Sequence, residues 1–184
     1  MKRVYLIRHG LPDFPQGQRM CLGRTDLPLS ATGLAQARDM AASLPPVSAV
    51  FSSPLQRALQ TARAIGSPIV VEDLQELFAG DWDGLLFSEI QQRYPELYAA
   101  RGITPGLPLP NGESDESGLH RFSLAMKRAA AMAYGDFAVV SHGGVIRLFL
   151  RSLGAQPRKP AYAEVVPLIY EHGTFILQEE IPHA

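Results

Sequence analysis

The chain alternates short apolar runs rich in β-branched residues with longer segments whose apolar residues recur at helical spacing. The strand-like runs cover residues 4–7, 47–51, 69–71 and 137–141, and the helical segments cover 30–44, 53–65, 86–101, 145–153 and a long stretch from 114. Strands that alternate with helices are typical of a parallel sheet covered on both faces. The sequence therefore predicts a three-layer α/β/α sandwich around a mainly parallel sheet, with a closing hairpin or edge strands at 164–170 and 174–177.

Helix-start signals sharpen this prediction. Ser30 and Ser114 precede helical segments and are expected to cap them through their side chains. Ser53 is predicted to cap the second helix, with Pro54 at the first helical position. Pro95 should break the segment 86–101 or begin a new helix there.

Composition supports one domain and excludes several classes of protein. Of 184 residues, 46% are hydrophobic, enough for one sizeable core, so we expect a single domain over 1–184. The 17 Lys and Arg residues balance 18 Asp and Glu residues. The chain thus lacks the excess positive charge typical of proteins that bind nucleic acid or an anionic membrane.

Cysteine content and the N-terminal segment bear on location. Cys21 is the single cysteine, which excludes an internal disulfide and a thiolate zinc cage. The apolar run 4–7 is too short for a signal peptide, and no apolar run approaches the ~20 residues of a membrane helix. We therefore predict a cytoplasmic protein.

Two histidines follow two predicted strands. His9 and His142 each come directly after a buried strand and stand beside glycines, Gly143 among them, that let the backbone approach a ligand closely. Ligands of open α/β sheets bind at the carboxyl ends of strands, so the two imidazoles should meet there. The other histidines, His120, His172 and His183, are expected to have no catalytic role.

Two arginines accompany this pair. Arg8 precedes His9, and Arg57 lies in the first turn of the second helix, just beyond another strand end. Guanidinium groups and the free amides of a helix N-terminus both suit phosphate oxygens. Two histidines and a carboxylate could instead bind a metal ion. The fixed positive charges disfavour that alternative, and we expect no metal and no other cofactor.

This set of groups suits phosphoryl transfer. A neutral imidazole can attack phosphorus and form a phosphohistidine while the cations hold the phosphoryl oxygens. The leaving alkoxide needs a proton, and Glu76 is the preferred donor because its apolar, aromatic neighbours should raise its pKa. Asp81 and Asp83 remain competing donors from spacing alone.

Six ordered blocks carry a family resemblance. They lie at residues 6–10, 23–30, 52–58, 76–84, 111–114 and 141–147. Together they resemble the histidine phosphatase superfamily, the phosphoglycerate mutase-like family. The resemblance implies a phosphoglycerate mutase-like fold, phosphorylation of His9, phosphate binding by Arg8 and Arg57, a second histidine at His142 and Glu76 as general acid.

The chain also departs from the family pattern. Pro15 stands where the family has an asparagine that contacts phosphate, so this contact is absent or comes from Gln16, Gln18 or Arg24. The family's mutases carry paired arginines in an insertion, whereas here the corresponding stretch offers only Arg101. This weakens the mutase alternative and favours small phosphatases such as the alpha-ribazole phosphatases.

The leading hypothesis is therefore a phosphomonoesterase that hydrolyses a small-molecule phosphate ester, with alpha-ribazole phosphate as one candidate. A phosphoglycerate mutase is the alternative, and a non-catalytic phosphate-binding regulatory module is a third hypothesis. Residues 85–112 are expected to cover the site as a cap that selects the leaving group. We expect no nucleic acid or membrane partner, and a monomer or a homodimer that pairs through an edge strand at 165–170.

Overall fold

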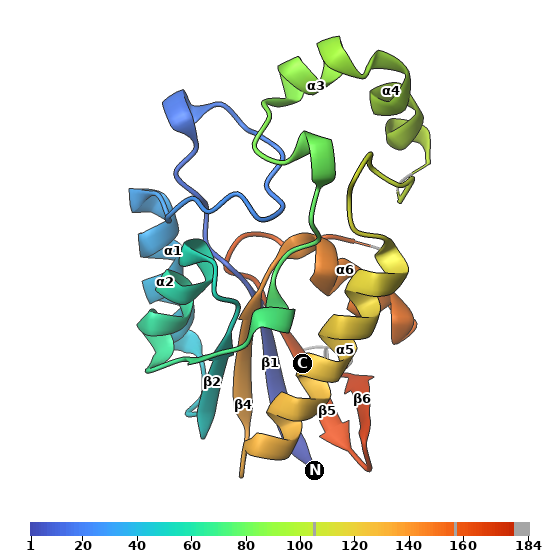
Figure 1. Ribbon diagram of the computed structural model, residues 1–184. Helices are drawn as coiled ribbons and strands as arrows, with labels where there is room; N and C mark the ends of the chain where they lie inside the picture. The colour runs from blue at the N-terminus through green and yellow to red at the C-terminus, as the bar shows by residue number, and fades with distance from the viewer. Residues whose placement is uncertain (105, 157, 179–184) are drawn as a thin grey trace, which may run out of the picture.

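A computed structural model describes residues 1–104, 106–156 and 158–178. Its sheet has six strands in the order β3-β2-β4-β1-β5-β6 (Figure 1). They are β1 Lys2–Arg8, β2 Ala49–Ser52, β3 Ile69–Val70, β4 Phe137–Ser141, β5 Val165–Glu171 and β6 Thr174–Leu177. The strands β1 to β4 pair in parallel, and β5 runs antiparallel to both β1 and β6. The predicted mainly parallel sheet with a closing hairpin is confirmed.

The helices occupy the predicted segments. They are α1 Ala31–Ser43, α2 Gln56–Ile65, α3 Phe87–Arg93, α4 Pro95–Ile103, α5 Asp115–Met132 and α6 Gly143–Ser152. Short 3-10 turns occur at Pro15–Gly17, Glu72–Leu74 and Gly80–Trp82. Pro95 begins α4, as expected for a residue that cannot continue α3.

Helix caps match the prediction at two of three positions. Ser30 Oγ accepts a hydrogen bond from the backbone N–H of Gly33 at 3.0 Å, and Ser114 Oγ accepts from that of Ser117 at 3.1 Å. The prediction for Ser53 is wrong, because α2 begins three residues later at Gln56. The backbone N–H of Gln56 donates instead to Asp26 Oδ1 at 2.7 Å, so a carboxylate from a distant loop caps this helix.

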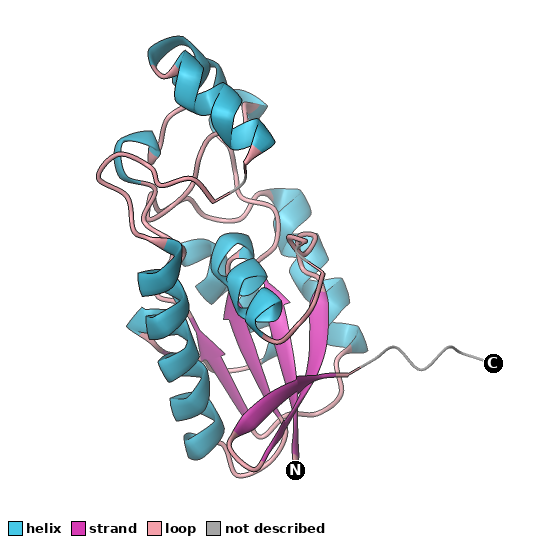
Figure 2. Cartoon of the chain, turned by 90° about the vertical axis from the view of Figure 1, so that its right-hand side faces the viewer, coloured by secondary structure: helices cyan, strands magenta, loops and turns pink. Residues whose placement is uncertain are grey.

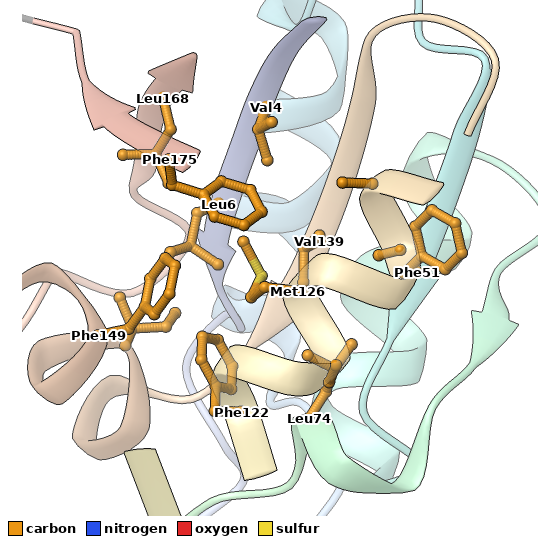
Figure 3. Close-up of a cluster of buried hydrophobic side chains, with 14 of the residues drawn as sticks. Val4, Leu6, Phe51, Leu74, Phe122, Met126, Val139, Phe149, Leu168 and Phe175 are labelled. Carbon is orange, nitrogen blue, oxygen red and sulfur yellow. The ribbon is translucent and has the colours of Figure 1, made fainter. Parts of the chain in front are cut away.

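Alternate side chains of the central strands point to opposite faces of the sheet and belong to two separate hydrophobic cores. Val4 and Leu6 of β1, with Val139 of β4, pack against α5 and α6 in the larger core, part of which Figure 3 shows. Tyr5 and Ile7 face the other side and pack against α1 and α2. This two-sided burial gives the predicted three layers, visible edge-on in Figure 2.

The strand β5 differs from its predicted place. It pairs with β1 over residues 165–170 and with β6 over residues 168–171, so most of this strand lies inside the sheet and is not the free edge that we expected for a homodimer. In the part of the chain that the structure describes, no helix is long and apolar enough to cross a membrane.

Strand order determines which side chains can meet. β4 lies between β1 and β2, with Arg8 opposite Ser141 and Ser52 opposite Val140. The carboxyl ends of these three strands therefore lie together. The helices α3 and α4 stand beyond this end of the sheet (Figures 1 and 2). A third small core, with Trp82 and Ile90 buried at its centre, packs beneath them.

Candidate active site

The two predicted histidines lie side by side. His9 follows β1 and His142 follows β4, and the backbone N–H of His9 donates to the carbonyl of Ser141 at 3.0 Å. Their ring centroids are 5.1 Å apart, and the ring planes are tilted by 56°. Both side chains are buried. The two histidines therefore meet at the strand ends, as predicted.

The His9 ring is oriented by its own turn. Its Nδ1 lies 2.7 Å from the carbonyl oxygen of Gly10. If Nδ1 carries the proton and donates to this carbonyl, Nε2 retains a free lone pair. Gly10 is required there, because a Cβ on it would lie 2.5 Å from the carbonyl oxygen of Gly33. Burial, followed by the charge of Arg57, holds the pKa of His9 well below its usual 6.5, so the imidazole is neutral.

The His142 ring is oriented by Ser53, a residue that we predicted to cap α2. Its Nε2 lies 2.7 Å from Ser53 Oγ, and both residues are fully buried. This bond engages the hydroxyl that we expected to cap α2. Burial and the charge of Arg57 also lower the pKa of His142 well below 6.5. No local sequence signal distinguishes this use of Ser53 from a cap.

Both predicted arginines are buried, and backbone carbonyls orient them. Arg8 donates from Nη1 to the carbonyl of Pro160 at 2.7 Å and stacks on Tyr162, its Cζ 3.8 Å from the ring centroid. Arg57 donates to the carbonyls of Gly23 and Thr25, each at 2.8 Å. Desolvation lowers the pKa of both arginines. Their positive charges are thus fixed in place at the strand ends.

Three nitrogens of this site are buried without a hydrogen-bond partner among the described residues: Arg8 Nε, Arg57 Nε and His142 Nδ1. Buried polar groups almost always have partners. Three such atoms on neighbouring side chains indicate a site built for a polar ligand, and the two guanidinium groups make that ligand an anion.

The Glu76 side chain, from the loop before the 3-10 turn Gly80–Trp82, reaches the N-terminus of α6. Its Oε2 accepts from the backbone N–H of Gly144 at 2.8 Å, and its Oε1 accepts from those of Val145 and Leu77, each at 2.9 Å. We expected apolar, aromatic surroundings for the Glu76 carboxyl group, and this prediction is wrong. The carboxyl group faces these amides, and Phe78 is partly exposed. Gly144 is required here, since a Cβ on it would lie 2.6 Å from Glu76 Oε1.

The competing acids hold loops together. Asp83 accepts from the backbone N–H groups of Gly23, Arg24 and Thr25 at 3.1, 2.6 and 3.1 Å. Asp81 accepts from Asn111 Nδ2 at 2.9 Å. Neither carboxylate lines the cavity that contains His9.

Of the remaining predicted residues, some lie away from the cavity that contains His9 and one lies beside Arg8. The Arg24 side chain is 45% exposed, lies 3.7 Å from Glu113 and sits over Phe78, so it is not brought to His9. Gln16 and Gln18 are exposed on the loop and do not line that cavity. Gly143 is the first residue of α6, and a Cβ on it would lie 2.9 Å from Arg8 Nε.

Two adjoining cavities open at this end of the sheet. A cavity of about 130 Å³ contains Arg8, His9 and Glu76, and a second of about 310 Å³ extends toward Arg101 of α4 and Arg147 of α6. Four residues line both: Cys21, Leu22, Glu76 and Lys159. Burial raises the pKa of Cys21 to about 11, so this thiol stays protonated. Sequence reasoning missed Lys159 and Tyr162, which follow α6 without a motif.

Within residues 1–104, 106–156 and 158–178, no group of three or more His, Cys, Asp or Glu side chains is arranged to hold a metal ion. His120 and His172 are exposed and outside both cavities. His183 lies outside the described residues.

Comparisons with known proteins agree on one family. A model of the histidine phosphatase superfamily (branch 1) matches residues 4–179. The bifunctional protein Rv2228c of Mycobacterium tuberculosis is 36% identical over 158 residues, which cover 81% of this chain but 43% of that protein. This chain therefore spans less than half the length of that relative.

Two further relatives are matched over most of their length. The adenosylcobalamin/alpha-ribazole phosphatase of Escherichia coli is 33% identical over 168 residues, covering 84% of this chain and 80% of that protein. The solved structure of mycobacterial glucosyl-3-phosphoglycerate phosphatase Rv2419c with VO3 superposes with a TM-score of 0.82 at 26% identity. That alignment covers 97% of this chain and 98% of the other.

Proposed function

The chain belongs to the histidine phosphatase superfamily, and from this premise we propose that it hydrolyses small-molecule phosphate monoesters through a phosphohistidine on His9. The family places it among phosphoric monoester hydrolases, and relatives named as phosphatases support the same class. One observation carries the proposal: His9, a buried neutral imidazole, lines the same cavity as the buried Arg8 guanidinium group and the Glu76 carboxyl group.

The first step transfers the phosphoryl group to the protein. His9 Nε2 attacks phosphorus, an N–P bond forms, and the P–O bond to the leaving group breaks. Arg8, Arg57 and His142 bind the phosphoryl oxygens while their charge shifts. Glu76, protonated at this stage, donates its proton to the leaving oxygen. Its position on both cavities supports this role, because the acid must face phosphoryl group and leaving group at once.

The second step regenerates the protein. The Glu76 carboxylate now accepts a proton from a water molecule, and the water oxygen attacks phosphorus. The N–P bond breaks, inorganic phosphate leaves, and His9 is again neutral. No step in this sequence requires a metal ion or an organic cofactor.

The larger cavity, about 310 Å³, is the proposed site of the leaving group. It lies beneath the segment 85–112, which we propose as the cap that selects the substrate within a single domain over 1–184. Alpha-ribazole phosphate is one candidate substrate, because a relative at 33% identity carries that activity in its name. A panel of alpha-ribazole phosphate, sugar phosphates, phosphoglycerates and nucleotides tests this, and a bisphosphate-primed assay tests the mutase alternative.

The decisive experiment replaces the nucleophile. His9→Ala should abolish hydrolysis of p-nitrophenyl phosphate, and wild-type protein quenched during turnover should carry an acid-labile phosphate that the variant lacks. His120→Ala, at an exposed position on α5, is the matched control and should keep full activity. Normal turnover by His9→Ala contradicts the mechanism, and a protein that never becomes phosphorylated supports the binding-module hypothesis.

A further inference from the structure

The candidates near Pro15 and Arg24 do not replace the phosphate contact that the family makes from this loop. Pro15 begins an exposed 3-10 turn, and the nearby Gln16 and Gln18 are also exposed. Arg24 is directed toward Glu113 and Phe78. None of these side chains lines the cavity that contains His9. Arg19 of the same loop does line that cavity, whereas Lys159, from another part of the chain, lines both this cavity and the larger one.

Lys159 lies where the two cavities meet. It lies in the loop between α6 and β5 and is one of four residues that line both cavities. Its chain crosses directly over Gly143, where a Cβ would lie 2.3 Å from Lys159 Cε and 2.9 Å from Arg8 Nε. Because Gly143 has no side chain, the side chains of Lys159 and Arg8 can both lie against its backbone. The residue keeps solvent contact, as expected on the rim of an open cleft.

The lysine has no competing partner. Among the described residues, no carboxylate lies within ion-pair distance of its ammonium group, and it forms no side-chain hydrogen bond. Desolvation lowers the pKa of Lys159. The negative charge of Glu76 raises this pKa, and the positive charge of Arg8 lowers it further. The charge of Lys159 also contributes to the lowered pKa of His9, so it acts on the reaction centre.

We propose that Lys159 is a third phosphate-binding cation, whose ammonium group contacts an oxygen of the transferring phosphoryl group on the side nearest the leaving group. This inference rests on the proposed function and assigns a residue to the same site. Lys159 stays protonated in both steps and transfers no proton. It stabilises the negative charge on the phosphoryl oxygens as the P–O bond breaks and the N–P bond forms.

The test compares three variants with the wild-type protein. Lys159→Met removes the charge at nearly constant length, Lys159→Arg restores it, and Lys127→Met makes the same change at an exposed position on α5. Measurements are kcat/KM for p-nitrophenyl phosphate, for 3-phosphoglycerate and for glycerol 3-phosphate, and the affinity for inorganic vanadate. We expect Lys159→Met to lose roughly 10- to 100-fold in kcat/KM on all three esters and to bind vanadate at least about tenfold more weakly. Lys159→Arg should recover most of both, and Lys127→Met should match wild type within about twofold.

Two results overturn the proposal. If Lys159→Met loses activity only on 3-phosphoglycerate, the lysine recognises an anionic leaving group instead. If it loses activity on every ester but binds vanadate normally, and its melting temperature falls, its role is structural. Should wild-type protein hydrolyse none of the esters, the proposed function fails, whereas vanadate binding to wild type and Lys159→Met still decides the role of the lysine.

Discussion

The floor of the site and its cap are built on different principles. The floor, formed by the strand-end residues Arg8, His9, Ser53, Arg57 and His142, is buried, and hydrogen bonds to backbone or side chains fix each member. The cap, α3 and α4, rests on a small core of its own around Trp82 and Ile90. Under the proposed function, the reaction depends on these fixed, buried residues, and substrate choice depends on α3 and α4. Changes in the floor should alter kcat, and changes in the cap should alter KM.

The largest effect after loss of the nucleophile should come from Glu76→Gln. This variant keeps one of the two oxygens that accept from the helix amides, puts an NH2 group in place of the other, and cannot transfer a proton. We expect kcat/KM to fall by about 10³-fold for alkyl phosphates and by a smaller factor for aryl phosphates, whose leaving groups need less protonation. An equal loss across a series of leaving groups would contradict the role of Glu76 as acid.

A positioning effect is expected from Ser53→Ala. The variant removes the only described hydrogen bond of the His142 ring and should reduce kcat by about 10-fold with little change in KM. Ser53→Thr should recover part of the loss if the hydroxyl is what matters. Ser48→Ala, in the turn before β2, is a control and should leave kcat unchanged. A change in KM alone would place Ser53 in substrate binding.

The cap should respond in the opposite way. Arg101 lines the larger cavity, 5.6 Å above the Trp82 ring. Arg101→Gln should raise KM by about threefold to tenfold for the best substrate of the panel while kcat stays within twofold. Arg93→Gln, on the exposed face of α3, serves as the control. If Arg101→Gln lowers kcat instead, cap and floor are not separable.

The histidines should stay neutral in mildly acidic solution. A pKa lowered below 6.5 means that the neutral ring, the nucleophilic form, persists as pH falls through 6.5. NMR of the imidazole nitrogens should therefore show His9 and His142 mainly unprotonated at pH 6. Half-protonation of either ring at pH 6.5 would show that burial does not control its charge.

The smallest expected effect is that of metal removal. Dialysis against EDTA should leave kcat/KM unchanged within experimental error, since two arginines supply the positive charge at the phosphoryl group. The measurement is the rate before and after dialysis, and again after adding Mg²⁺ or Zn²⁺. A loss that a metal ion restores would argue against the proposed mechanism.

Strand-end rules predicted the meeting of His9 and His142, because each follows a buried strand and β1 and β4 are neighbours. The same rules could not predict Ser53 as the partner of His142. A serine before proline signals a cap locally, and only the packing of β2 against β4 shows the alternative.

Other features depend on long-range packing. Glu76 accepts a hydrogen bond from the backbone N–H of Gly144, which lies 68 residues further along the chain. The residues beside Glu76 in the sequence therefore do not indicate what surrounds its carboxyl group. Lys159 and Tyr162 reach the site from a loop that carries no motif. The hairpin β5-β6 was predictable from its turn, whereas its insertion beside β1 was not, since alternating apolar residues fit either an edge or an inner strand.

Strand order also has a consequence for synthesis on the ribosome. β1 and β2 never touch directly, and each pairs with β4, which is made some 85 residues after β2. The early chain therefore exposes two apolar strands whose common neighbour does not yet exist. Folding of the sheet must wait until residues 137–141 emerge, a non-local assembly that is slow and prone to aggregation. A nascent chain stalled before β4 should bind chaperones, and one stalled well beyond it should resist proteolysis.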